Sequence, residues 1–147
     1  MSCIRFNTPA QRAQMKAMAP AMLTSEQAAA LHPAPPVTDS KINRLRLLAK
    51  DPNPRIRESV ASSYHAPEEL LVELAQDPDE GVRTWLARNE TASCDILRSL
   101  ADDESERVRG FLALNYFVPA DVMDKLAGDE SETVRGLVEW KAQLATS

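Results

Sequence analysis

Acidic and basic side chains recur at a fixed spacing along most of this chain of 147 residues. One aspartate and one arginine return every 26 residues, and they are Asp51, Asp77, Asp103 and Asp129 with Arg57, Arg83, Arg109 and Arg135. These carboxylates and guanidinium groups could bind ligands. A residue that every copy of a repeat retains normally serves the repeat itself, so we interpret both series as structural, in helix capping and in bridging neighbouring units. As exposed ion pairs they would each contribute little to stability.

The positions at which the copies differ are better candidates for a binding site. The first helix of each unit carries three such positions, occupied by Ser59, Trp85, Phe111 and Leu137, by Ser62, Arg88, Leu114 and Trp140, and by Tyr64, Glu90, Tyr116 and Ala142. Trp85 and Phe111 share one position in consecutive units and are expected to be neighbours. They either fill the core between units or anchor a partner at the surface, where aromatic and arginine residues concentrate binding energy. On the second interpretation the candidate partner contacts are Trp85, Arg88, Phe111 and Tyr116.

Basic residues gather at the start of the repeated region. Residues 41–66 carry six basic and two acidic side chains, whereas residues 67–147 carry eight basic and eighteen acidic ones. An alternative function follows, in which nucleic-acid phosphates are bound by Lys41, Arg44, Arg46, Lys50 and Arg55. Nucleic-acid binding depends on neutralising phosphates, so the acidic remainder of the chain disfavours this alternative. The opposed charges also permit head-to-tail self-association.

Residue types that support catalysis or metal binding do not cluster in the sequence. His32 and His65 are isolated, and Cys3 and Cys94 lie too far apart for metal-ligand spacing. The chain has four glycines, no glycine-rich phosphate loop and no nucleophile motif. We therefore predict no enzymatic activity, no cofactor and no metal, and we expect Cys94 to be a small buried residue.

The beginning of the chain does not repeat. Residues 1–38 are predicted to form an N-terminal arm or cap that ends in a proline-rich linker, His32-Pro33-Ala34-Pro35-Pro36. Residues 39–147 are predicted to form the repeat domain. The residues leave open whether the arm covers the exposed end of the repeats or docks on a partner.

Each unit is expected to contain two short helices, of which the first begins at the repeated aspartate. The aspartate side chain would accept hydrogen bonds from free N–H groups of the first turn. In three units a glutamate follows three residues later, as in Asp77 and Glu80, which is the spacing of a capping box. Pro52 and Pro78 are then expected at the first helical position, where proline is tolerated.

Asparagine is expected to end this first helix, at Asn89 and Asn115. It would do so either by adopting the left-handed conformation or by pairing its amide with neighbouring backbone. The second helix is expected to begin at Pro67, Ser93 and Pro119, and it would bury leucine and other branched side chains.

The order of these residues resembles the leucine-rich repeat variant family and the wider HEAT-like class. The shared pattern is Leu-Ala-x-Asp-x-x-x-x-Val-Arg-x-x-Val/Leu-Ala-x-Asn, then a proline and a leucine-rich short helix, and it covers residues 41–147. The resemblance implies a right-handed stack in which α-helices alternate with 3₁₀ or short α-helices, tied by ladders of acids and arginines. It transfers no catalytic residue. Some family members carry a cysteine-rich iron–sulfur segment before the repeats, but only Cys3 precedes them here, so that cofactor is not implied.

Together these observations predict an all-α fold, namely a right-handed α-α solenoid of about four 26-residue repeats, each with a short helix and an α-helix. The predicted function is that of a protein–protein interaction scaffold or adaptor without catalysis, whose partner is an unidentified protein. No apolar run approaches the roughly 18–20 residues that span a bilayer, and the first residues lack the apolar stretch of a signal peptide. We therefore expect a bacterial cytoplasmic protein with no membrane contact.

Overall fold

An all-helical arrangement accounts for residues 36–145, the part of the chain that the computed structural model describes. This range holds no strand and eight helices, namely α3 (Asp39–Leu48), α4 (Pro54–Ala61), α5 (Glu68–Leu74), α6 (Glu80–Ala87), α7 (Cys94–Leu100), α8 (Glu106–Leu114), α9 (Ala120–Ala127) and α10 (Glu132–Ala145). The predicted all-α fold is confirmed. The chain divides into Met1–Pro36 and Val37–Ser147, and all eight helices belong to the second unit. The predicted arm, apart from its last residues, lies outside the described range, as do Cys3 and His32.

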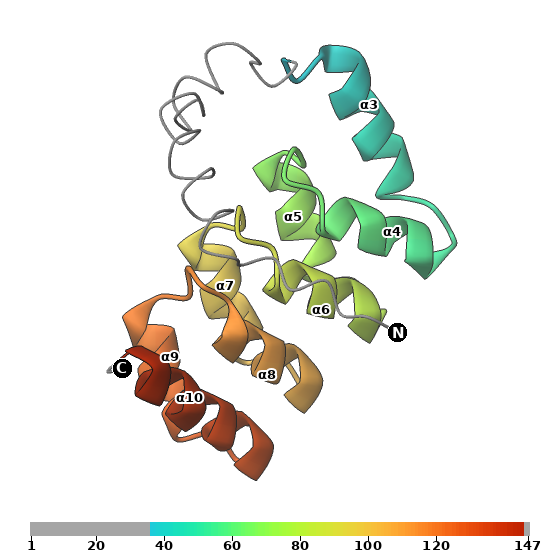
Figure 1. Cartoon of the computed structure of the whole chain (residues 1–147). Coiled ribbons are helices and arrows are strands. Elements are labelled where there is room, and N and C mark those ends of the chain that lie inside the picture. The colour runs from blue at the N-terminus through green and yellow to red at the C-terminus, as the bar shows by residue number, and fades with distance from the viewer. Residues whose placement is uncertain (1–35, 146–147) are drawn as a thin grey trace, which may run out of the picture. The chain divides into compact units, whose positions relative to one another are not determined.

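The helices form two rows (Figure 1). We call α4, α6, α8 and α10 the first row, because they pack against one another in chain order. We call α3, α5, α7 and α9 the second row; α5, α7 and α9 each contact the first-row helices that precede and follow them. Each helix therefore packs mainly against elements close to it in the sequence.

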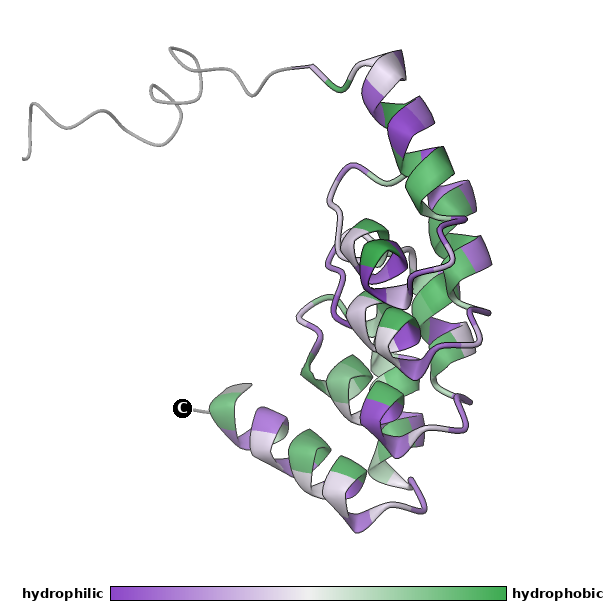
Figure 2. Cartoon of the chain, turned by 90° about the vertical axis from the view of Figure 1, so that its right-hand side faces the viewer, coloured by the Kyte–Doolittle hydropathy of each residue, from purple (hydrophilic) through white to green (hydrophobic). Residues whose placement is uncertain are grey.

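Branched apolar residues at helical spacing fill the space between the helices. Val82 and Leu86 on α6 are four residues apart and fully buried, and Val108 and Leu112 repeat the pair on α8. This spacing places both side chains of a pair on one face of the helix. Hydrophilic residues gather in the turns that join the helices (Figure 2).

The first-row helices begin two or more residues later than the sequence predicts. Asp77 does not cap α6; its Oδ1 accepts a hydrogen bond from the N–H of Asp79 at 2.9 Å. Asp79 is the N-cap, and its Oδ1 accepts from two N–H groups of the first turn. Asn53 and Ser105 cap α4 and α8 with their own side chains. The predicted capping box is wrong, because Glu80 is the first residue of α6.

The placement predicted for two prolines is wrong for the same reason. Pro52 and Pro78 lie in the turn between the repeated aspartate and the N-cap. Pro54 is the proline that occupies the first helical position, in α4. Its missing N–H costs nothing there, because the first N–H groups of a helix have no partner within the helix.

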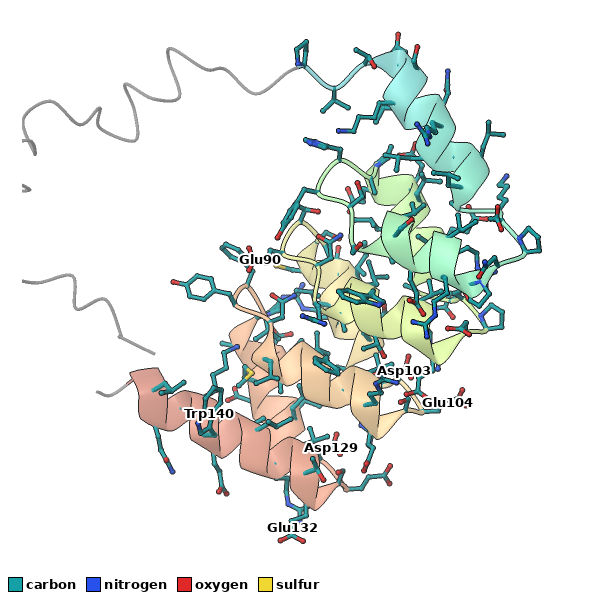
Figure 3. All side chains as sticks on the ribbon, turned by 45° about the vertical axis from the view of Figure 1, so that its right-hand side comes forward. Glu90, Asp103, Glu104, Asp129, Glu132 and Trp140 are labelled. Carbon is teal, nitrogen blue, oxygen red and sulfur yellow. The ribbon has the colours of Figure 1, made fainter. Side chains whose placement is uncertain are left out.

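Ion pairs between the repeated arginine and the aspartate of the next unit tie the turns together. Each arginine binds both carboxylate oxygens, and Nε lies 2.7, 2.7 and 2.8 Å from Oδ2 in Arg57–Asp77, Arg83–Asp103 and Arg109–Asp129. We call these three pairs the ladder; Figure 3 shows two of its aspartates at the starts of α8 and α10. The predicted bridging is confirmed. The expectation of exposed pairs is wrong, because none of the six side chains is more than 14% exposed.

Asparagine couples the ends of the first-row helices. Asn89 donates through Nδ2 to the carbonyl oxygens of Ala61 at 2.7 Å and Ser63 at 3.3 Å, both in the preceding unit. Asn115 makes the equivalent two bonds one unit later. No described residue has a positive φ. The left-handed alternative is therefore wrong, and pairing of the amide with neighbouring backbone is confirmed.

Lysine takes over the role of asparagine in the last unit. Lys141 Nζ donates to the carbonyl oxygens of Ala113 at 2.9 Å and Asn115 at 2.5 Å. Burial lowers the pKa of the Lys141 ammonium group. The change from asparagine to lysine therefore preserves the same contact with the preceding unit.

Acid is expected to weaken the ladder. The hydrogen bond from Arg109 holds the pKa of Asp129 below its ordinary value. Aspartate in an unfolded chain has a pKa of about 3.9. Just below this pH the unfolded state therefore binds more protons than the folded state. The stability from this pair is thus complete above about pH 5 and is lost as the pH falls through the folded-state pKa. Urea denaturation across this range measures the loss, and Asp129→Asn should flatten the pH profile. Identical profiles for the two proteins would contradict this expectation.

Candidate protein-interaction face

Three of the four predicted partner contacts meet around one guanidinium group. Trp85 lies on α6, and Arg88, three residues later, is the C-cap of the same helix, so both side chains project from one face. Phe111 occupies the position of Trp85 on α8, the next first-row helix. Arg88 Cζ lies 4.5 Å from the centroid of the Trp85 ring and 5.2 Å from that of Phe111. Stacking of this kind attracts the cation to the negative ring faces.

The two interpretations left open for the aromatic pair apply to different residues. Phe111 is partly buried and packs against the core, as the core interpretation requires. Trp85 is 38% exposed, as the surface interpretation requires. Arg88 therefore contacts one ring that is partly buried and another that is exposed to solvent.

A second aromatic pair follows α8. Tyr116, the fourth predicted contact, is 79% exposed, and Phe117 beside it is 54% exposed. Their rings meet edge to face, with centroids 5.1 Å apart. Sequence reasoning missed Phe117, although the comparison of copies contains a signal for it. The other units carry polar or titratable residues there, namely His65, Thr91 and Gln143.

Three pockets meet at Phe111. The charged pocket, of about 460 Å³, lies between α4, α6 and α8 and is lined by Trp85, Arg88 and Phe111 among others. The tyrosine pocket, of about 290 Å³, adjoins it and is lined by Arg88, Phe111 and Tyr116 with three neighbours. The apolar pocket, of about 360 Å³, lies between α8 and α10, where Phe111, Leu114 and Leu137 contribute. The structure thus places all four predicted contacts around two adjoining pockets.

The charged pocket contains residues that sequence reasoning did not connect with the aromatic pair. Its basic residues besides Arg88 are Arg55 from α4 and Arg107 from α8. Arg55 pairs with Glu58 at 3.1 Å, whereas Arg107 lies 3.9 Å from Glu80. Residues of three helices can be assigned to one pocket only once the packing of the helices is known.

Glu90 and Trp140 lie away from the aspartates of the ladder. Figure 3 shows Glu90 and Trp140 at one end of the first-row helices, and Asp103 and Asp129 at the other. Glu90 lines the tyrosine pocket. The tyrosine pocket therefore lies toward the end of the first-row helices opposite the ladder aspartates.

The residues of the phosphate-binding alternative are distributed over two helices and a turn. Lys41, Arg44 and Arg46 belong to α3, Lys50 lies in the turn after it, and Arg55 belongs to α4. Arg46 binds Glu69 of α5 at 2.9 Å, and Arg55 binds Glu58. Arg46 and Arg55 therefore already have carboxylate partners. Arg55 also lines the charged pocket.

Other candidate reactive groups lie apart from this face. Cys94 is exposed at the first residue of α7, so the expectation of a buried residue is wrong. The buried residues of that helix are Ile96, Leu97 and Leu100. His65 is exposed in the turn before α5. Within residues 36–145 no three His, Cys, Asp or Glu side chains come close enough to hold a metal ion.

Comparisons with protein-family models, with curated proteins and with solved structures found no match to this chain. The leucine-rich repeat variant resemblance therefore stays a prediction. None of the described helices is both long enough and apolar enough to cross a membrane. The geometry of the face supplies the basis for a functional proposal.

Proposed function

We propose that this protein is a binding module without catalysis that engages a partner protein through the face formed by Trp85, Arg88, Phe111 and Tyr116. The observation that carries the proposal is the stacking of Arg88 on two aromatic rings beside pockets open to solvent. Aromatic and arginine side chains set in well-packed pockets supply most of the binding energy at protein interfaces. Trp85 and Phe111 lie on two helices that pack against each other, which limits the entropy lost when these rings bind a partner.

We further propose that the scaffold is a right-handed α-solenoid of the leucine-rich repeat variant type. The recurrence of the ladder and of the asparagine bonds at steps of 26 residues supports this architecture. In such a stack each unit packs on its neighbours and presents one variable face. The variable positions predicted from the sequence would then form the binding surface.

The proposed partner is a different protein rather than a second copy stacked on α10. Ala61, Ala87 and Ala113 occupy one position of the first-row helices and are fully buried. Glu139 occupies this position on α10 and is exposed. A second copy packed there as a further unit would bury the Glu139 carboxylate without a partner, which is costly.

The test is affinity purification with quantitative mass spectrometry. Trp85→Ala/Tyr116→Ala should reduce recovery of specific partners at least about tenfold, the effect of losing a binding hot spot. Val72→Ala is the matched control, because Val72 is 53% exposed on α5 in the second row. Circular dichroism should show that both variants remain folded. Equal recovery by the wild type and the double variant would overturn the proposal.

A further inference from the structure

Arg88 differs from the other two arginines of the charged pocket in its contacts. Arg55 and Arg107 each have a carboxylate within 4.0 Å, whereas Arg88 contacts the Trp85 and Phe111 rings and forms no ion pair within the described residues. An aromatic ring accepts no strong hydrogen bond. The five N–H donors of a guanidinium, which match a carboxylate in two-point contact, therefore stay available on Arg88.

The carboxylates of the charged pocket contact groups other than Arg88. Three arginines line it, together with the carboxylates of Glu58 and Asp79. Glu58 is held by Arg55, and Asp79 accepts hydrogen bonds from the first turn of α6. Arg107 is paired with Glu80, so Arg88 is the cation of the pocket that has no carboxylate partner among the described residues, and a ligand carboxylate can pair with it.

A buried hydroxyl group belongs to the same pocket. Thr84 lines it and is 4% exposed, and its Oγ1 has no hydrogen-bond partner. Buried polar groups are almost always paired, and an unpaired one calls for an explanation. This atom has less than 1 Å² of accessible surface, so a ligand in the pocket would contact it only if the Thr84 side chain moved.

We propose that the charged pocket binds an aspartate or glutamate side chain of a partner peptide, with Arg88 as its principal contact. The proposal rests on the proposed function, because it specifies what the interaction face recognises. The tyrosine and apolar pockets adjoin the charged pocket at Phe111. A peptide chain can therefore continue past the acidic residue, so the ligand is an internal side chain with bulky apolar neighbours.

The test begins with selection of a random peptide library, displayed with both peptide ends blocked by fusion, against the full-length protein. Selected peptides should share one acidic residue next to an apolar one. Each is then synthesised with acetylated and amidated ends, and its dissociation constant is measured by fluorescence anisotropy. Changing the acidic residue to its amide, or Arg88→Gln, should each weaken binding about 10–100-fold. Combining both changes should cost little more than either one, because they remove the same contact.

Arg98→Gln is the control variant. Arg98 lies on α7 in the second row and pairs with Asp95 and Asp121, so the peptide affinity should not change. Selected peptides without an acidic residue that lose binding in Trp85→Ala would overturn the carboxylate assignment and leave the proposed function standing. Unchanged affinity in Arg88→Gln, or displacement of the peptide by inorganic phosphate more readily than by acetate, would also overturn the assignment. Failure to enrich any peptide would count against both proposals.

Discussion

Replacing Arg109 with methionine is expected to lower the free energy of unfolding by about 3–5 kcal/mol, the cost of breaking a buried ion pair by removing one partner. The side chains of Arg109 and Asp129 are 7% and 6% exposed. Methionine fills much of the same volume but leaves the buried Asp129 carboxylate without the guanidinium that pairs with it, and only the more weakly interacting Arg135 remains nearby. It also removes the hydrogen bond from Nη1 to the carbonyl oxygen of Asp103. Urea denaturation monitored by circular dichroism measures the change.

Two further variants separate this explanation from a general loss of charge. Arg98→Met breaks an ion pair with Asp121 of 2.8 Å in which both side chains are about half exposed, so its effect should be far smaller. Arg109→Met/Asp129→Leu removes both charges and should regain part of the stability. It should not regain all of it, because Asp129 also accepts the N–H of Ser131. Equal losses in Arg98→Met and Arg109→Met would show that burial does not decide the cost.

Asn89→Leu is expected to cost about 2–4 kcal/mol, because it leaves several polar groups without partners. The Asn89 side chain donates to the carbonyl oxygens of Ala61 and Ser63 and accepts from the N–H and hydroxyl groups of Thr91. Asn89 is only 4% exposed, so water cannot readily replace these bonds. Thermal unfolding and urea denaturation should both report the loss.

Lys141→Asn is the matched variant for this second prediction. Lysine and asparagine donate to equivalent carbonyl oxygens in their respective units, so the exchange should change stability much less than Asn89→Leu does. A large loss in Lys141→Asn would show that the lysine serves another purpose. A small loss in Asn89→Leu would show that the asparagine bonds contribute little.

The helices and their buried positions follow from the sequence because their signals are local. Apolar residues at helical spacing, such as Val82 and Leu86, predict which side of each helix is buried. The N-caps do not follow in the same way. Asp77 and Asp79 are both residues that cap helices, and they stand two positions apart. Asp77 forms an ion pair with Arg57 of the preceding unit. Only this tertiary contact shows that Asp79, and not Asp77, caps α6.

Some features of the candidate face likewise follow from the local sequence, whereas others depend on tertiary packing. The proximity of Trp85 to Arg88 follows from their spacing on one helix, and that of Phe111 follows from the repeat. Arg55 and Arg107 reach the charged pocket from α4 and α8. Their convergence depends on how three helices pack, which no short stretch of sequence specifies. The exposure of Trp85 depends on the same packing.

The short sequence separation of the bonds between units has a consequence for how quickly the chain folds. The ladder joins residues 20 positions apart, and the asparagine bonds join residues 26 or 28 positions apart. Little chain entropy is lost in closing loops of this size, and proteins dominated by such nearby contacts fold in microseconds to milliseconds. Folding can start at any adjacent pair of first-row helices and spread in both directions. A partner peptide lying across α6 and α8 would then hold together one of the pairs from which that growth can proceed.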